Sequence, residues 1–113
     1  LPLSHGERLL VGSIARYHEQ TLPSLKHDHY AALEESQRAL VHTLGGMLRL
    51  ADALDYNHRR RVTDLTCGYD EETIVIRCLV SGDVREEKQE ALARCDLLAA
   101  AFERRITLKF IKR

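Results

Sequence analysis

Hydrophobic residues recur at helical spacing through the first half of the chain and at alternate positions shortly after residue 61. Ser4 and Glu7 have the spacing of a capping box, which predicts a helix from there to about residue 20. Its inner face is expected to carry Leu10, Ile14, Tyr17 and His18. A second helix is predicted over residues 34–55. The apolar positions that follow a period of 3.6 there are Leu40, Leu44, Met47, Leu48, Ala51 and Leu54.

The segment between these helices, residues 21–33, is expected to be a solvated connection. The His-Asp-His triplet at residues 27–29 predicts polar surface rather than a metal site, because adjacent loop residues seldom hold a metal without further ligands. Within the second helix, Gly45 and Gly46 are locally unfavourable. They indicate either close packing against another backbone or a kink, and the sequence leaves both interpretations open.

The second half of the chain begins with two predicted strands, residues 62–68 and 73–80, joined by a turn at residues 69–72. The period of 2 places every second side chain on one face of the sheet. In a simple hairpin, three cross-strand pairs would share that face: Cys67 with Ile74, Leu65 with Ile76, and Thr63 with Cys78.

A third helix is predicted over residues 84–105 and a last strand over residues 106–111. The predicted fold class is therefore α+β: a helical hairpin in residues 1–58, followed by a small ββαβ unit in residues 59–113 with one helix packed on a three-stranded sheet. Two helices alone bury little apolar surface, so the hairpin requires a partner. That partner is more chain upstream, a second subunit, or the α+β unit.

Composition narrows the function classes. The 113 residues suit one domain with a modest core. Lys and Arg number 17 and Asp and Glu number 17, and this zero net charge argues against a nucleic-acid-binding domain. No apolar run approaches the roughly 20 residues that span a bilayer, so no membrane association is expected. Three scattered cysteines without a CxxC pair fit reduced packing residues in the cytoplasm.

Recognised catalytic motifs are absent from the sequence, which has no GxSxG, P-loop, GxGxxG, HExxH or CxxC pattern. Polar residues on predicted helices concentrate in two groups: Arg16, Tyr17 and His18, and Arg49, Asp52 and Asp55. Arg49 and Asp52 are three residues apart, which favours an ordinary helical ion pair, although their row at the rim of the core could also border a pocket. If the two helices cross, His18 could approach Asp52, either as part of a site or as a core histidine bonded to a carboxylate.

Four short motifs carry a family resemblance. They are ARYH at residues 15–18, PSL at 23–25, LRLADALD at 48–55 and AAFERRITLKF at 100–110. In this order and spacing they resemble the C-terminal region of the exopolyphosphatase / guanosine pentaphosphate phosphohydrolase family. The resemblance covers most of the chain.

The resemblance implies an actin-like catalytic domain upstream, which hydrolyses the terminal phosphoanhydride of polyphosphate or guanosine pentaphosphate with Mg²⁺ or Mn²⁺. It implies that residues 1–58 belong to an HD-like helical domain. Asp52 best matches the last metal-binding aspartate of HD domains, and Asp55 and His58 complete the remnant. The histidine and the His-Asp doublet would lie before Leu1, and His27-Asp28 is no substitute because it follows the ARYH helix. No metal site and no catalytic residue are therefore expected in this chain.

The leading hypothesis is an accessory C-terminal domain that binds a polyanion and assembles a cytoplasmic homodimer without containing the catalytic centre. Arginine forks match phosphate oxygens, so the basic residues are the expected contacts. The candidates are Arg16, His18, Arg49, Arg59, Arg60 and Arg61. One alternative is a regulatory or scaffolding module that makes only protein contacts. A second alternative is a degenerate HD-type metal phosphohydrolase.

Overall fold

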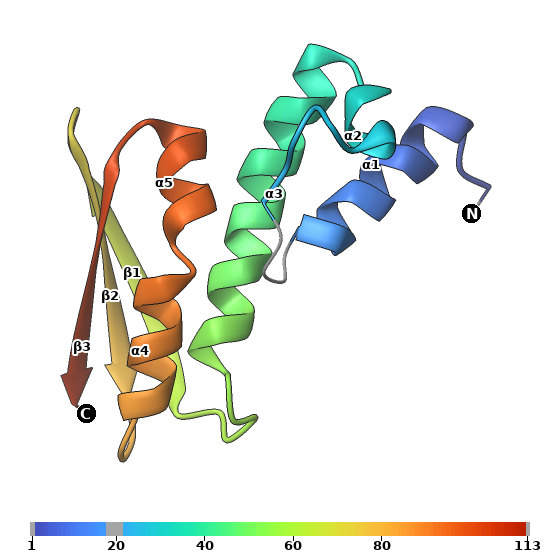
Figure 1. Ribbon diagram of the computed structural model, residues 1–113. Coiled ribbons are helices and arrows are strands. Elements are labelled where there is room, and N and C mark those ends of the chain that lie inside the picture. Colours follow the sequence, from blue (N-terminus) through green and yellow to red (C-terminus); the bar gives the residue numbers. More distant parts are fainter. Residues whose placement is uncertain (1, 18–21, 113) are drawn as a thin grey trace.

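The α+β class is confirmed by the computed structural model, which describes residues 2–17 and 22–112. The described chain forms five helices and three strands (Figure 1). In chain order these are α1 (His5–Tyr17), α2 (Asp28–Ala31), α3 (Glu35–Leu54), β1 (Val62–Tyr69), β2 (Thr73–Val80), α4 (Arg85–Ala93), α5 (Asp96–Phe102) and β3 (Arg105–Lys112).

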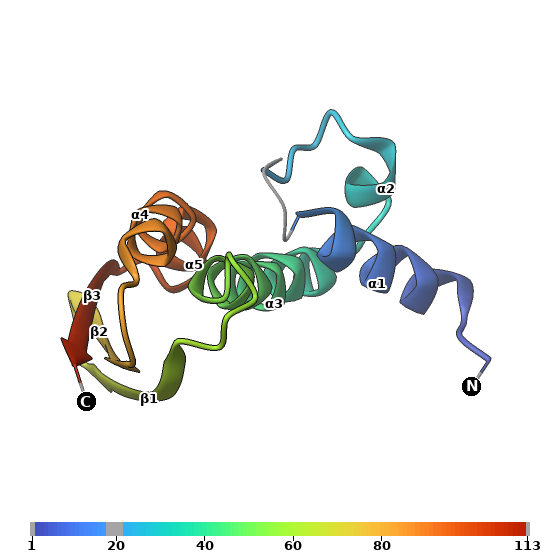
Figure 2. The ribbon, with the colours of Figure 1, turned by 90° about the horizontal axis from the view of Figure 1, so that it is seen from below.

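The elements lie in successive layers. The sheet is at one side, α4 and α5 cover it, α3 packs beside them, and α1 and α2 lie on the far side of α3 (Figures 1 and 2). Strand order is β1-β2-β3, with β1 antiparallel and β3 parallel to the central β2. The parallel pairing follows from the crossover through α4 and α5, since parallel strands need a long connection.

The predicted hairpin register is wrong by two residues. Cys67 pairs with Ile76 and Leu65 with Cys78, because Tyr69 still belongs to β1 and the turn is tighter than expected. The Asp70 side chain accepts bonds from the backbone N–H groups of Glu72 and Thr73, at 2.8 Å each, which closes that turn. A shift of two preserves the face of Leu65 and Cys67. Thr63 leaves that face because a bulge lies between Val62 and Asp64.

The predicted third helix is also wrong as a single element, since it is interrupted between Ala93 and Asp96. Arg94, in the interruption, and Asp96, the first residue of α5, both form ion pairs with α3. Arg94 pairs with Asp52 at 3.2 Å, and Asp96 pairs with Arg49 at 3.2 Å. The second piece, α5, continues into β3 after Glu103, a residue with a positive φ of 52°.

Close packing, rather than a kink, explains the two adjacent glycines, because α3 runs unbroken through them. A Cβ atom on Gly46 would lie 2.8 Å from the backbone nitrogen of Leu98 and 2.9 Å from its Cα atom. A Cβ atom on Gly45 would meet the Leu97 side chain at 3.5 Å. Gly46 therefore lets the backbone of α5 lie directly on α3.

The first apolar cluster, called here the sheet-side cluster, joins α3 to the sheet and to its covering helices. Its buried members are Leu50, Ala53, Leu54, Ile76, Cys78, Val80, Val84, Ala91 and Leu98. They come from both sides of the domain boundary expected near residue 58. The α+β unit is thus a packing partner for the second predicted helix, which was one of the three possibilities that the sequence left open.

The second apolar cluster, called here the tyrosine cluster, lies on the opposite side of α3. It consists of Tyr17, Tyr30, Leu33, Val41 and Leu97. The prediction of a fully solvated connection at residues 21–33 is therefore wrong in part, because that segment contains α2 and buries Tyr30 and Leu33. Tyr17 and Tyr30 meet edge to face with ring centroids 5.8 Å apart, a favourable aromatic geometry.

The helices α1 and α3 run in the same general direction. The Cβ position of Gly6 lies 3.7 Å from the Gln37 side chain, and that of Gly45 lies 3.9 Å from Tyr17. Described α1 ends at Tyr17, so the predicted end near residue 20, and with it His18, lies outside the described residues. The second predicted helix begins one residue later than expected, with Glu34 and Gln37 forming its capping box.

Candidate anion-binding site

The expected ion pair between Arg49 and Asp52 does not form. The Arg49 side chain is buried and its Nη2 donates to Asp96 Oδ1 at 3.2 Å. Its Nε and Nη1 atoms have no hydrogen-bond partner among the described residues and are shielded from solvent. Asp52 accepts from Arg94 instead. In this arrangement a phosphate would have to displace Asp96 before it could reach Arg49.

The remaining members of the expected HD-like remnant are also engaged locally. Asp55 accepts from the backbone nitrogen of Arg60 at 3.0 Å, and His58 Nδ1 lies 3.8 Å from Asp55 Oδ2. Within residues 2–17 and 22–112, no group of three or more His, Cys, Asp and Glu side chains is placed to hold a metal ion. The absence of a tight metal site stays a prediction.

The arginine run Arg59, Arg60 and Arg61 follows the C-terminal end of α3 and lies among carboxylates. Arg59 lines a hollow together with Asp83, Arg85, Glu86 and Glu87. Arg61 lies directly over Gly82. Tyr17, next to Arg16, contacts Gly45, and α3 continues for nine residues, about 14 Å, beyond Gly45 before this run begins. The structure therefore does not bring the run together with Arg16.

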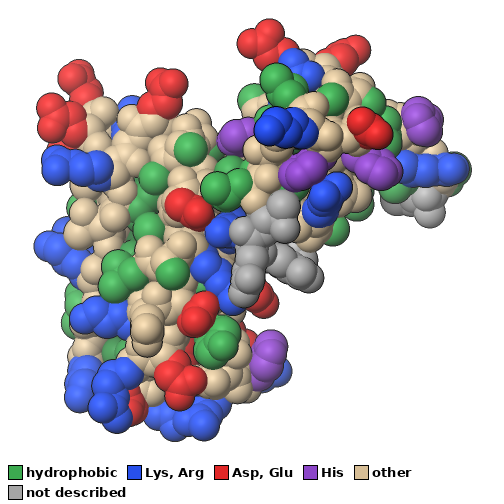
Figure 3. All heavy atoms as spheres, in the orientation of Figure 1, with side chains coloured by type: hydrophobic (Ala, Val, Ile, Leu, Met, Phe, Trp, Pro, Cys, Tyr) green, Lys and Arg blue, Asp and Glu red, His purple; other side chains and the backbone are tan. Residues whose placement is uncertain are grey.

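A more concentrated cationic site lies between α1 and α2. Arg16 lines a hollow of about 440 Å³ there, and the other charged or titratable residues around it are Arg8, His5 and His29. We call this hollow the α1–α2 cleft. Figure 3 shows histidine, arginine and lysine side chains gathered on this lobe of the molecule. No carboxylate lines the cleft in the described part of the chain.

The sequence of α1 explains why the cleft is open and cationic. Arg8, Gly12 and Arg16 are four residues apart, so they follow one face of the helix. Nothing lies within 4 Å of a Cβ position on Gly12, so the helix surface between the two arginines is open. Neither Arg8 nor Arg16 has an ion-pair partner among the described residues, and the guanidinium carbon of Arg16 lies 5.5 Å from the centre of the Tyr17 ring.

Ser13 gives the cleft a buried polar group. Its side chain is only 2% exposed and lines the hollow, and its Oγ atom has no hydrogen-bond partner within the described ranges. Buried hydroxyl groups are normally paired, and an unpaired one costs about 1–3 kcal/mol. Because this oxygen is shielded from solvent, an anion in the cleft could reach it only after a local rearrangement of the surrounding side chains.

Two tyrosine–histidine hydrogen bonds hold α2, and therefore His29, against the rest of the lobe. The Tyr17 hydroxyl is bonded to His27 Nδ1, and the Tyr30 hydroxyl lies 2.8 Å from His42 Nε2. Burial lowers the pKa of His42 and raises the pKa of Tyr30, which favours the neutral forms of both groups. This supporting network was not predicted from the sequence.

The chain is a small α+β protein with a surface cleft lined by two arginines and two histidines. Guanidinium forks and imidazole N–H groups can donate to phosphate or carboxylate oxygens. No protein-family model and no curated protein matches this chain. No helix of the described residues is both long and apolar enough to cross a membrane.

Proposed function

We propose that this chain is a C-terminal accessory region of an exopolyphosphatase-family phosphoanhydride hydrolase and that it binds the polyanion through the α1–α2 cleft. The order of the four sequence motifs supports the family. The observation that carries the binding role is the cleft itself, in which Arg8, Arg16 and two histidines converge without a carboxylate, in a chain of zero net charge.

The spacing of the cationic groups suits an extended polyanion. Arg8 and Arg16 are eight residues apart in one helix, so their Cα atoms are about 12 Å apart. A chain of linked phosphates can contact both guanidinium groups and pass over Gly12 between them. Polyphosphate fits this spacing better than a single phosphate does, and guanosine pentaphosphate remains the second substrate that the family resemblance suggests.

The catalytic chemistry belongs to an upstream actin-like domain in this proposal. Phosphoanhydride cleavage needs a phosphate cradle, a bridging metal and a group that positions water. Asp52 and Asp55 are engaged by Arg94 and by Arg60 and His58, which leaves them poorly suited to such roles. The proposal therefore assigns Mg²⁺ or Mn²⁺ to the upstream domain, places the protein in the cytoplasm, and expects the isolated chain to release no phosphate from polyphosphate.

A polyphosphate titration tests the binding role. Replacing Arg8 and Arg16 by Gln should weaken binding at low salt by at least about tenfold, because each charge-assisted hydrogen bond contributes roughly 1.5–3 kcal/mol. The matched control is the triple replacement of Arg59, Arg60 and Arg61 by Gln, which removes more charge elsewhere. Equal losses in the two variants would indicate nonspecific attraction and reject the cleft as the binding site.

A scaffolding role is the second candidate, because α3 exposes a row of apolar side chains. These are Leu40, Leu44, Met47 and Leu48. Exposed apolar patches of this kind mark contacts with partners, and a symmetric homodimer is the commonest outcome. Light scattering over a range of concentrations tests self-association. Stoichiometric metal in untagged protein would instead support the degenerate HD hydrolase.

A further inference from the structure

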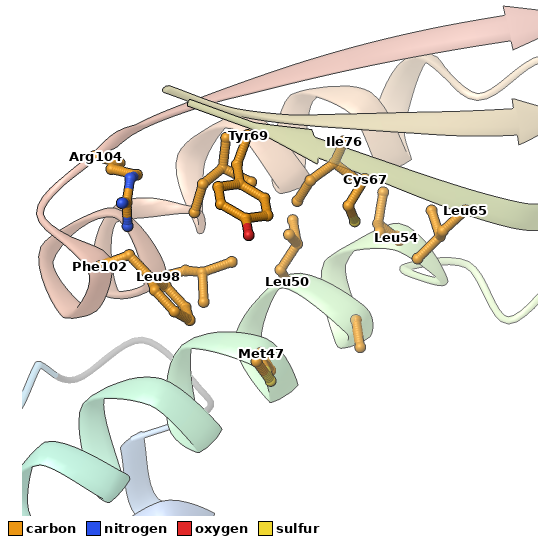
Figure 4. A pocket seen from close by; sticks show the side chains of 12 residues that line it. Met47, Leu50, Leu54, Leu65, Cys67, Tyr69, Ile76, Leu98, Phe102 and Arg104 are labelled. Atoms are coloured by element: carbon orange, nitrogen blue, oxygen red, sulfur yellow. The ribbon is translucent and has the colours of Figure 1, made fainter. Parts of the chain in front are cut away.

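An apolar pocket of about 410 Å³ lies between α3, α5 and the sheet, away from the α1–α2 cleft. In Figure 4 the side chains of Leu50, Leu98, Phe102 and Tyr69 point into a common space between the helices and the strands. Pockets of about 300–1,000 Å³ with mostly apolar walls are typical of small-molecule sites. Packing defects in protein interiors are much smaller than this.

The pocket exists because the helices do not cover the whole sheet. The buried sheet residues of the sheet-side cluster come from β2, and none of the residues of β1 is buried. Leu65 and Cys67 of β1 therefore form one wall of an open slot, and Met47 and Leu50 of α3 form the opposite wall. The two apolar walls make the slot suited to an apolar chain.

One end of the slot is polar. Arg104 is the one charged residue among those that line it in the described part of the chain. Its Nε donates to the Asp70 carbonyl at 2.8 Å, and its guanidinium carbon lies 5.9 Å from the centre of the Tyr69 ring. The two terminal nitrogens have no hydrogen-bond partner among the described residues. The guanidinium is thus held in place with two donor groups unpaired, and on its other side it lines a neighbouring hollow together with Glu71, Glu72 and Glu103.

We infer that this pocket binds an amphipathic small molecule that has a linear apolar chain and an anionic head group. The chain lies between α3 and the sheet, and the head group accepts hydrogen bonds from Arg104. Arg104, the one charged residue lining the pocket in the described part of the chain, favours an anionic head group, and the apolar walls favour a hydrocarbon chain. The inference does not depend on the proposed polyphosphate binding.

Cys67 provides a direct readout because it lines the pocket and is exposed. Cys78 is buried, and burial also raises the pKa of the Cys95 thiol, so both should react more slowly. Dodecanoate, used below its micelle-forming concentration, should slow alkylation of Cys67 by iodoacetamide in a saturable way. Dodecyltrimethylammonium, which has the same chain and the opposite charge, should protect at least about tenfold less well, the equivalent of one charge-assisted hydrogen bond.

Two variants locate the site. Arg104→Gln should weaken dodecanoate protection by about tenfold, the loss of one such hydrogen bond, and should leave protection by uncharged dodecanol unchanged. Lys109→Gln is the control, because it removes an exposed charge from β3 outside the pocket. Ala51→Phe, which fills the slot from α3, should abolish protection by both ligands.

Three results would overturn the inference: no saturable protection by dodecanoate, equal protection by the anion and the cation, or unchanged protection in Ala51→Phe protein that remains folded by circular dichroism. Protection of Cys67 that rises with protein concentration in the absence of ligand, together with a dimer mass, would also overturn it. That last result would identify a second copy of the chain as the occupant.

Discussion

The two sides of α3 are stabilised by different physical means. The sheet-side cluster is almost entirely aliphatic and is held by burial and close backbone approach. The tyrosine cluster is smaller and relies on Tyr17 and Tyr30, whose hydroxyl groups are bonded to His27 and His42. The apolar pocket lies on the side of the sheet-side cluster, whereas the α1–α2 cleft lies on the side of the tyrosine cluster, where polar contacts contribute to packing.

The two clusters meet at adjacent residues of α5. Leu97 belongs to the tyrosine cluster and Leu98 to the sheet-side cluster. The gap between α4 and α5 sets the direction of this short helix, and Gly46 lets its backbone approach α3. Variants at these positions can therefore test how far the two clusters are independent.

The largest effects are expected from truncating these two leucines. Leu97→Ala and Leu98→Ala should each lower the free energy of unfolding by about 2–5 kcal/mol, the usual cost of a buried leucine. Hydrogen exchange should distinguish the two variants. Leu97→Ala should increase amide exchange in α1 and α2, whereas Leu98→Ala should increase amide exchange in β2. Leu92→Ala, at an exposed position of α4, is the control and should cost less than about 0.5 kcal/mol. Equal loss of protection in β2 after Leu97→Ala would show that the two clusters unfold as one unit.

Replacing Gly46 and Gly12 by alanine should change the free energy of unfolding in opposite directions. Gly46→Ala introduces a Cβ atom 2.8 Å from the Leu98 backbone, so it should destabilise the protein by about 1–3 kcal/mol through overpacking. Gly12→Ala meets no neighbouring atom and should stabilise α1 by up to about 1 kcal/mol. Urea denaturation of both variants measures the difference. A stabilised Gly46→Ala protein would mean that α5 can move away from α3 without loss.

Much of the fold could be predicted because local patterns determine it. The periods of 3.6 and 2 located α1, α3 and all three strands. The predicted capping box of Ser4 and Glu7 is confirmed at the start of α1, where each backbone N–H donates to the other side chain. The hairpin register could not be predicted, because it depends on how Asp70 closes the turn and on a bulge at Thr63. The interruption before α5 depends on partners on α3, namely Asp52 and Arg49, which the local sequence does not reveal.

The candidate site could be predicted only in part. Arg16 was identified from the sequence, but Arg8, His5 and His29 were missed. His29 was missed because α2 lies within a segment interpreted as a loop. The spacing of Arg8, Gly12 and Arg16 was the available signal, since it places two cations on one face with a gap between them. The ion pairs of Arg49 and Asp52 depend on long-range contacts that helical spacing cannot specify.

Removing the Tyr30 hydroxyl should have a smaller effect than the core substitutions. Tyr30→Phe leaves the ring in place and deprives His42 Nε2 of its partner, so the free energy of unfolding should fall by about 0.5–1.5 kcal/mol. Tyr56→Phe is the matched control, because Tyr56 is exposed and should change stability by less than about 0.5 kcal/mol. Thermal unfolding of both proteins measures the difference. Identical melting temperatures would show that the hydrogen bond does not stabilise the tyrosine cluster.

The smallest expected effect is a pH dependence confined to the tyrosine-cluster side of α3. Burial lowers the pKa of His42 below 6.5, so the unfolded chain binds a proton at this residue more readily than the folded protein does. The free energy of unfolding should therefore keep its full value above pH 6.5 and should decrease as the pH falls below 6.5. Protonated His42 would also be able only to donate at Nε2, where it contacts the Tyr30 hydroxyl. His42→Gln keeps an acceptor without titrating, so its stability should change less between pH 7.5 and 5.5 than that of the unsubstituted protein. Chemical denaturation at several pH values compares the two, and parallel profiles would contradict a role for His42.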